Sequence, residues 1–295
     1  MSGQSFGVSK RVAATLAAAL LLGCGAVDPS PAGSALLESD QAACVERPAS
    51  EETVHVANTH GRLEGTLLLP SGCGPSPVAL IIPGAGPTDR DGNSPLGVNT
   101  RAYRLLAEAL RERGIGSLRY DKGGVAASAA AGPEVDQMRF ELGAEDARRF
   151  VELLRQDERV GRVVLIGHSE GSLVGMLASQ ATPVDAFVSL QGMGRPIGTV
   201  MREQLARSLG GDPEILAKAH AIITALELGE DPGDVPAALE SILPPVIHGY
   251  LSSYMKYDPA AEMARLTVND VLVVHGTTDI QASVADATLL VDARP

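Results

Sequence analysis

The chain contains no tryptophan, and Phe, Tyr and Trp together make up only 3% of its 295 residues. This scarcity argues against a platform that stacks sugars or nucleobases, because such platforms use aromatic faces. Basic residues are also few, at 24 Lys and Arg against 36 Asp and Glu, so the formal net charge is −12. An acidic chain without a basic stripe repels phosphate backbones, and no nucleic-acid partner is expected.

Motifs for metals and nucleotide cofactors are missing as well. The chain has neither an H-E-x-x-H nor a C-x-x-C sequence, and it shows no cluster of His and carboxylates. The glycine-rich stretch at residues 83–87 does not fit a dinucleotide fingerprint, because Asp89 stands at the third glycine position and Pro87 lacks a backbone donor. Neither a cofactor nor a metal is therefore expected.

Cysteine is rare, and the first of the three cysteines ends an export-like segment. Lys10 and Arg11 precede an apolar run over residues 12–22, which is too short to span a bilayer, and Cys24 follows it. Leu-Leu-Gly-Cys at 21–24 resembles the lipobox of bacterial lipoproteins. We expect residues 1–24 to be a lipoprotein signal peptide and residues 25–52 a flexible tether. The protein would then be exported and lipid-anchored to the bacterial cell envelope, on its periplasmic or extracellular face. An ordinary secretory signal with an incidental Cys24 is the alternative.

The other two cysteines, Cys44 and Cys73, flank two expected strands at 53–58 and 62–69. A hairpin there would return the chain after its second strand to the start of the first. Exported cysteines usually pair, so we expect a structural disulfide, with two unrelated thiols as the alternative.

Beyond this hairpin, short apolar runs alternate with helical patterns, which indicates a mostly parallel sheet flanked by helices. The expected strands are 78–82, 115–120, 163–166, 185–190 and 271–275, and the expected helices are 101–113, 138–156, 171–180 and 284–291. Between 192 and 269 the alternation stops, and helical segments at 198–209, 213–228 and 235–243 indicate an inserted helical cap. The domain is expected to cover residues 53–295.

The strongest local signal for chemistry is the G-x-S-x-G sequence at 167–171, which lies between an expected strand and an expected helix. This is the context of a nucleophile elbow, in which a sharp turn exposes the hydroxyl of Ser169. Such a serine needs backbone donors for the oxyanion of the tetrahedral intermediate. We expect the N–H groups of Glu170 and of Ala85, in the glycine loop at 83–87, to supply them.

Four motifs together resemble bacterial α/β hydrolases of the serine-aminopeptidase-like and esterase-D-like group. They are Pro-Gly-Ala-Gly-Pro-Thr-Asp-Arg-Asp-Gly at 83–92, Arg-Tyr-Asp-Lys at 119–122, Gly-His-Ser-Glu-Gly at 167–171 and Gly-Thr-Thr-Asp-Ile-Gln at 276–281. The resemblance covers residues 53–295 and implies an α/β-hydrolase fold and a carboxylesterase acting on short- to medium-chain acyl esters. It also implies that Asp279 is the acid of a Ser-Asp-His triad. One departure is the run Gly123-Gly124-Val125, where the group usually has Arg-Gly and a further Gly.

The triad histidine is the second departure. None follows Asp279, so the chain resembles a C-terminally truncated hydrolase that lacks its last strand and helix, with the histidine beyond residue 295. None of the six histidines is a good substitute; His168 points away from the nucleophile, and His275 precedes the acid at its strand end. A serine without imidazole is a poor nucleophile, so the chain as given is expected to be weak or inactive.

Neighbouring polar residues receive structural interpretations. Asp89, Arg90 and Asp91 are expected to pair within their loop, and Tyr120-Asp121-Lys122 to brace it from a strand end. The side chain of Glu170 is expected to be solvated.

Two function classes remain open from the sequence. The first is a membrane-anchored serine hydrolase, most simply a carboxylesterase, with a peptidase or thioesterase on the same fold as variants. The second is a catalytically inactive hydrolase-fold lipoprotein that binds a ligand or partner. The absent histidine favours the second class, whereas the elbow, the glycine loop and the acid favour the first.

Overall fold

A computed structural model describes residues 45–294. The expected signal peptide, the lipidation site Cys24, most of the expected tether and Cys44 lie outside the described residues. Within residues 45–294, no helix is both long and apolar enough to cross a bilayer.

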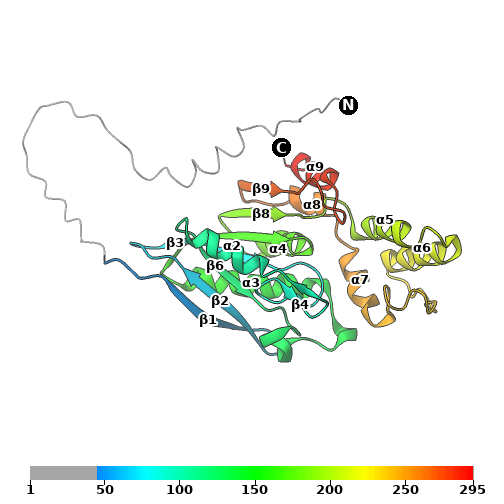
Figure 1. Cartoon of the computed structure of the whole chain (residues 1–295), viewed down its shortest axis with the longest axis horizontal. Coiled ribbons are helices and arrows are strands. Elements are labelled where there is room, and N and C mark those ends of the chain that lie inside the picture. Colours follow the sequence, from blue (N-terminus) through cyan, green and yellow to red (C-terminus); the bar gives the residue numbers. More distant parts are fainter. Residues whose placement is uncertain (1–44, 295) are drawn as a thin grey trace, which may run out of the picture. The chain divides into compact units, whose positions relative to one another are not determined.

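The centre of the domain is a seven-stranded sheet with the order β1-β2-β6-β3-β7-β8-β9 (Figure 1). The first two strands pair antiparallel, β2 also pairs antiparallel with β6, and the remaining neighbours are parallel. The expected mostly parallel sheet is therefore confirmed. The strands are β1 (Ser50–Ala57), β2 (Arg62–Leu69), β3 (Ser76–Ile82), β6 (Gly116–Tyr120), β7 (Val160–His168), β8 (Ala186–Leu190) and β9 (Asp270–Val274). A separate two-stranded ribbon joins β4 (Asn93–Ser94) and β5 (Val98–Asn99).

The first hairpin turns at Asn58, whose side-chain oxygen accepts the N–H groups of His60 and Gly61. Strand β1 begins three residues before the expected boundary at 53, and Arg47 forms a β-bridge with Gly72. Residues 47–52 are therefore part of the sheet region and not of a tether. Cys73 is disulfide-bonded; its expected partner, Cys44, is not among the described residues.

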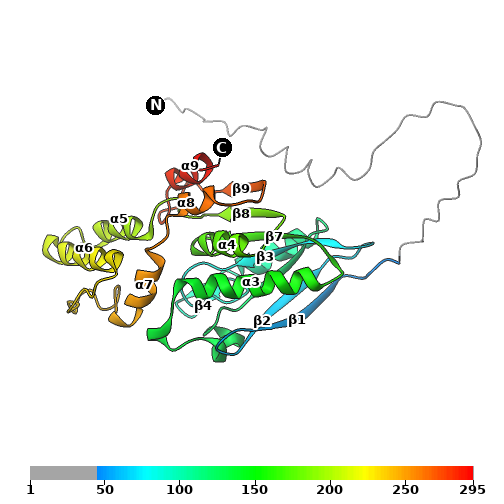
Figure 2. The same cartoon turned by 180° about the vertical axis from the view of Figure 1, so that it is seen from behind.

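Helices cover both faces of the sheet. On one face lies α2 (Ala102–Arg111), and α3 (Phe140–Gln156) and α4 (Glu170–Ala181) lie on the other, as the front and rear views show (Figures 1 and 2). The central strands are apolar on both sides for this reason; β3 is buried along nearly its whole length. The larger core joins these strands to Phe140 and Phe150, and a smaller core joins them to Tyr103 and Ala107.

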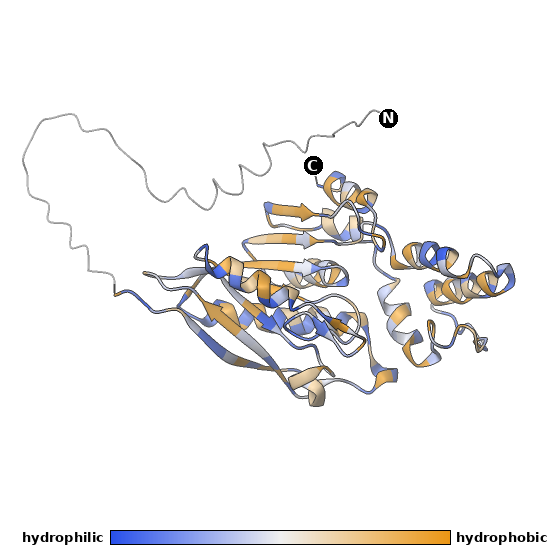
Figure 3. Cartoon of the chain, in the orientation of Figure 1, coloured by the Kyte–Doolittle hydropathy of each residue, from blue (hydrophilic) through white to orange (hydrophobic). Residues whose placement is uncertain are grey.

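Four α-helices and one short 3₁₀ helix lie between β8 and β9, where the sequence predicted a cap: α5 (Ile197–Leu209), α6 (Pro213–Leu228), η3 (Pro245–Ile247), α7 (His248–Tyr254) and α8 (Pro259–Ala264). Helices α5, α6 and α7 share an apolar cluster that includes Ile223 and Leu226 (Figure 3). The helix expected at 235–243 is wrong, because this stretch forms turns between Pro236 and Pro244. Proline removes a helix donor and disfavours helical geometry in the residue before it. The last helix, α9 (Val284–Asp292), follows β9.

Candidate active site

Ser169 occupies the turn between β7 and α4 with φ 53° and ψ −120°. A non-glycine residue rarely adopts this conformation, which costs about 1–3 kcal/mol and recurs at functional sites. The Ser169 side chain is partly exposed, and its backbone N–H donates to the carbonyl of Leu190 at the end of β8. The strand–turn–helix context predicted for the nucleophile is present, and it holds a strained serine.

Two glycines allow the neighbouring backbone to approach this turn. A Cβ on Gly171 would lie 2.5 Å from the carbonyl oxygens of both Ile82 and Pro83, at the end of β3. A Cβ on Gly84 would lie 3.1 Å from Nδ1 of His168 and 3.3 Å from the Cβ of Ser169. The glycine loop after β3 and the serine turn are therefore in direct contact, as an oxyanion site requires.

The loop at 83–87 is held through its carbonyl groups and one amide. Lys122 Nζ donates to the carbonyl oxygen of Gly84 at 2.6 Å, and the Thr88 hydroxyl donates to that of Ala85 at 3.2 Å. The Gly84 N–H donates to the Tyr103 hydroxyl at 3.1 Å. In the described part of the chain, the exposed Ala85 has no acceptor for its N–H, which leaves this donor free for a ligand.

The charged residues after this loop pair mainly with the sheet, which corrects the expectation that they pair with one another. Arg90 donates to both carboxylate oxygens of Asp121, through its backbone and its guanidinium, and it also pairs with Glu64. Asp91 pairs with the buried Arg119. Only Asp89 acts within the loop, where it accepts backbone N–H groups. These contacts fix the loop to β2 and β6.

His168, which precedes Ser169 in the chain, is hydrogen-bonded to another side chain. Its Nδ1 lies 2.8 Å from the Tyr103 hydroxyl. Since that hydroxyl accepts the Gly84 N–H, its proton is directed to Nδ1, and the ring proton of neutral His168 is then on Nε2. Burial lowers the pKa of His168, and the charge of Asp279 acts in the opposite direction. His168 thus serves as an acceptor for Tyr103.

The Glu170 side chain is buried, at 8% exposure, and the expectation that it is solvated is wrong. The Tyr250 hydroxyl, from cap helix α7, hydrogen-bonds to it, and burial together with this carboxylate raises the pKa of Tyr250. Burial lowers the pKa of Lys122, whereas the Glu170 charge raises it. Glu170 therefore interacts both with the cap, through Tyr250, and with Lys122, which holds the glycine loop.

Asp279 lies in the loop after β9, and its Oδ1 accepts the N–H groups of Gln281 and Ala282. Its Oδ2 has no hydrogen-bond partner within residues 45–294. The side chain of Gln191, just after β8, accepts the Gly276 N–H at 2.6 Å and so ties this loop to the strand beside the nucleophile.

The loop that carries Asp279, called the acid loop below, is held in place by Asp286, which is fully buried. Arg195 forms two hydrogen bonds with its carboxylate, and the N–H groups of Gly194 and Ser283 donate to it. Burial would raise the pKa of Asp286, but these hydrogen bonds outweigh it and lower the pKa to about 2. The Ser-x-x-Asp pattern of a capping box at 283–286 could have revealed this contact from the sequence.

All six histidines lie within the described residues, and none contacts Ser169 or Asp279 through a hydrogen bond. His275 uses Nε2 to meet the carbonyl oxygen of Ala282, and its buried Nδ1 has no partner. His55 pairs with Glu64 and His248 with the carbonyl of Leu243. The structure thus brings the glycine loop into contact with the serine turn and places Asp279 in the loop after β9, and none of the six histidines is hydrogen-bonded to the serine.

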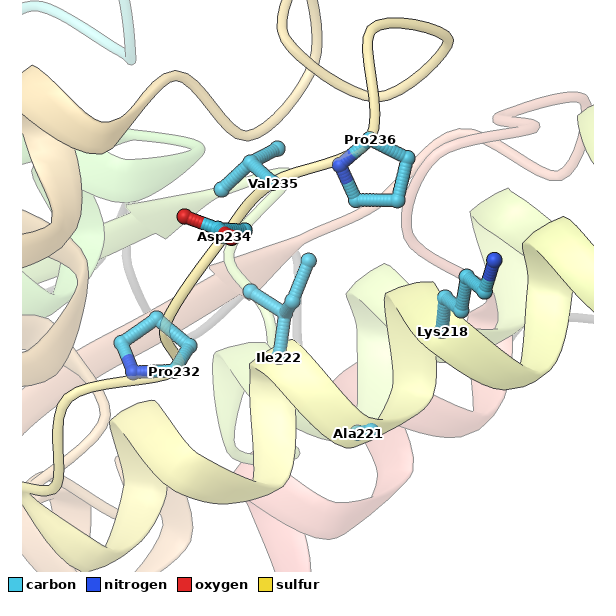
Figure 4. Close-up of a pocket in the computed structure, with 7 residues that line it drawn as sticks. All are labelled: Lys218, Ala221, Ile222, Pro232, Asp234, Val235 and Pro236. Atoms are coloured by element: carbon cyan, nitrogen blue, oxygen red, sulfur yellow. The ribbon is translucent and has the colours of Figure 1, made fainter.

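Two hollows open on the cap. One, of about 500 Å³, lies between α6 and the loop at 232–236 and includes none of the predicted site residues (Figure 4). The other, of about 530 Å³, lies between α5 and the acid loop, with Ile280 and Gln281 in its wall. The second hollow therefore adjoins the residue after the candidate acid. Among the described residues, no group of three His, Cys, Asp or Glu side chains could hold a metal ion.

Known proteins with similar sequences include hydrolases. A family model described as serine aminopeptidase, S33, matches residues 96–205, a stretch that includes Ser169 but neither Ala85 nor Asp279. Esterase EstD of Thermotoga maritima is 29% identical over 226 residues, which are 76% of this chain and 52% of the relative. The chain thus spans about half the length of that relative.

Solved structures show the same fold. Est1E from Butyrivibrio proteoclasticus, in complex with ferulic acid, superposes with a TM-score of 0.54 at 17% identity, covering 82% of this chain and 85% of that one. The α/β hydrolase GrgF from Penicillium sp. sh18 gives a TM-score of 0.56 at 18% identity, covering 83% and 86%. The described domain has the α/β-hydrolase fold, and its relatives include esterases.

Proposed function

We propose that this protein is a serine carboxylesterase whose nucleophile is Ser169. The observation that carries the proposal is the strained serine turn in contact with a glycine loop whose Ala85 N–H has no acceptor within residues 45–294. A buried structural serine would need neither the strain nor the free amide. The similarity to esterase EstD supports an ester as the substrate.

In this proposal the Ser169 hydroxyl attacks the ester carbonyl, and the N–H groups of Ala85 and Glu170 stabilise the developing oxyanion. Preorganised donors of this kind are worth about 10²–10³-fold each in rate. The alcohol leaves, and water then releases the acid from the acyl-enzyme. Asp279 would orient a histidine through its Oδ2, while the loop amides hold its Oδ1.

The histidine remains the missing part of this mechanism among the described residues. Without a base the serine proton has no acceptor, so we expect weak ester hydrolysis from the 295-residue chain. We further propose that the acyl chain enters the hollow beside the acid loop, whose apolar wall contains Met201, Leu205, Ile242 and Ile280.

Export remains part of the proposal, and it rests on the sequence alone. Cleavage before Cys24 and its acylation would place the esterase at the membrane surface of the cell envelope, where acyl esters are abundant. Its partners would then be the membrane and a small acyl ester.

Chemical rescue tests the esterase proposal directly. Imidazole in solution can replace a missing histidine as the base if Ser169 and its oxyanion donors form the proposed site. We expect imidazole to raise hydrolysis of p-nitrophenyl butyrate by the wild-type chain at least about tenfold above that of Ser169→Ala under the same conditions. Equal rates for the two proteins would contradict the proposal. Fast Ser169-dependent hydrolysis without imidazole would refute the expected weakness but support the esterase.

The second candidate function, a hydrolase-fold lipoprotein that only binds a ligand or partner, is favoured by the absence of a histidine on Ser169. It predicts equal rates in the rescue experiment. It also predicts that Ser169→Ala leaves the protein's ligand binding unchanged.

A further inference from the structure

Lys122, just after β6, has no part in the mechanism above. Its ammonium lies 2.6 Å from the carbonyl oxygen of Gly84, a short, charge-assisted hydrogen bond. The Lys122 side chain ends among backbone groups, and it forms no salt bridge with a carboxylate in the described chain. Burial lowers its pKa, and the nearby Glu170 charge opposes this effect.

The contacted carbonyl belongs to the peptide unit whose N–H is that of Ala85. This peptide is trans, so its C=O and N–H groups point in opposite directions. A donor that fixes the carbonyl on one side therefore fixes the N–H on the other. The Gly84–Ala85 peptide unit can rotate through coupled changes in ψ of Gly84 and φ of Ala85, and glycine at 84 places no Cβ against this rotation, so the unit needs a partner on its carbonyl to hold it.

We propose that Lys122 is a positioning residue for the oxyanion hole: it fixes the Gly84–Ala85 peptide so that the Ala85 N–H faces the oxyanion formed on Ser169. This inference rests on the proposed esterase function. The neighbouring contacts agree with it, since the Gly84 N–H is held by Tyr103 and the Ala85 carbonyl by Thr88. Ala85 is left with one free backbone donor, and Lys122 sets its direction.

The ammonium also strengthens that donor. A carbonyl that accepts a charged hydrogen bond withdraws electron density from its own peptide, so the N–H at the other end becomes a better donor. Glu170 contributes in two ways, because its amide is the second oxyanion donor and its buried carboxylate favours the charged form of Lys122. The ammonium of Lys122 therefore links the peptide that carries the Ala85 N–H to Glu170, which carries the second donor.

Lys122→Met tests the proposal, since methionine matches the lysine side chain as far as Cε and lacks the ammonium donor. Lys256→Met is the matched control, because Lys256 is exposed at the end of α7. In the imidazole-assisted assay, we expect Lys122→Met to lower the Ser169-dependent kcat about 10- to 100-fold and to change KM less than about twofold. Lys122→Arg, which can still donate to the carbonyl, should recover most of the loss, and the control should match the wild type.

An amide resonance makes the test independent of turnover. The ¹H and ¹⁵N shifts of the Ala85 N–H report hydrogen bonding to the carbonyl of its own peptide unit. We expect Lys122→Met to move this resonance and Lys256→Met to leave it in place. An unmoved Ala85 resonance, or a kcat unchanged in folded Lys122→Met, would overturn the role of Lys122. If the wild type shows no Ser169-dependent turnover, the esterase proposal fails, and the Ala85 resonance still decides whether Lys122 orients the peptide.

Discussion

Replacing Gly171 with alanine should disrupt the active site more than the fold. A Cβ at this position would lie 2.5 Å from two backbone carbonyl oxygens at the end of β3, where ordinary contact begins at 3.4 Å. Because both neighbours are backbone atoms, no flexible side chain can give way. Helix α4 must therefore move by about 0.9 Å relative to β3, the difference between these two separations.

This movement separates the two donors of the oxyanion hole, since Glu170 begins α4 and Ala85 lies in the loop after β3. A misplacement of about 1 Å in an active site costs about 10²-fold in rate. Overpacking a buried contact costs about 1–3 kcal/mol of stability. We therefore expect Gly171→Ala to remain folded and to lose about 100-fold in Ser169-dependent hydrolysis.

The assay compares imidazole-assisted hydrolysis of p-nitrophenyl butyrate with thermal unfolding by circular dichroism. Gly211→Ala is the control, because a Cβ there would meet no atom within 4 Å. A folded Gly171→Ala variant with activity within about twofold of the wild type would refute the contact between elbow and glycine loop.

Three further predictions concern stability and the acyl pocket. Burial raises the pKa of Asp146 from 3.8 to about 6, so the protonated carboxyl stabilises the fold at low pH, and this stability is lost as the pH rises from 3.8 to 6. Asp146→Asn should therefore raise the free energy of unfolding at pH 7 by roughly 1–3 kcal/mol, measured by urea titration. Asp286 has the opposite sign, because its pKa of about 2 stabilises the fold above pH 3.8 and this contribution is lost as the pH falls toward 2; Asp286→Ala should cost about 3 kcal/mol at pH 7, and the exposed Asp292→Ala nearly nothing. Filling the hollow beside the acid loop with Ile242→Trp should shift the ratio of octanoate to acetate hydrolysis toward acetate, whereas Val246→Trp, outside its wall, should not. Unchanged pH profiles or an unchanged ratio would contradict the respective prediction.

Elements with clear end signals could be predicted from the sequence. Helix α6 has its expected bounds, because Asp212 caps its start, proline is its first residue and Gly229 ends it with φ 73°. Strand β2 also has its expected bounds. Helix α8 was missed although Asp258 and Pro259 give the same start signal. Helix α8 has only six residues, too few to show a helical apolar pattern. Residues 235–243 do show such a pattern, but Pro236 and Pro244 prevent a helix there.

The residues of the site also differ in how far the sequence predicts them. Ser169 and the glycine loop follow from local sequence, because a turn and its neighbours are specified by adjacent residues. Tyr103 lies in the helix expected at 101–113, where the sequence gives it no role in the site, yet its hydroxyl joins Gly84 to His168. The buried Glu170 has its hydrogen-bond partner in Tyr250 of the cap, 80 positions along the chain. Contacts that cross between elements in this way carry no local sequence signal.

Covalent labelling tests the central claim most directly, because it asks whether Ser169 is the nucleophile of a working oxyanion site. The wild-type chain and Ser169→Ala are incubated with a fluorophosphonate in the presence of imidazole, and the adduct is located by intact mass and peptide mapping. We predict one adduct per wild-type chain, on Ser169, and none on Ser169→Ala. Labelling at another residue, or no labelling of the folded wild-type protein, would contradict the account.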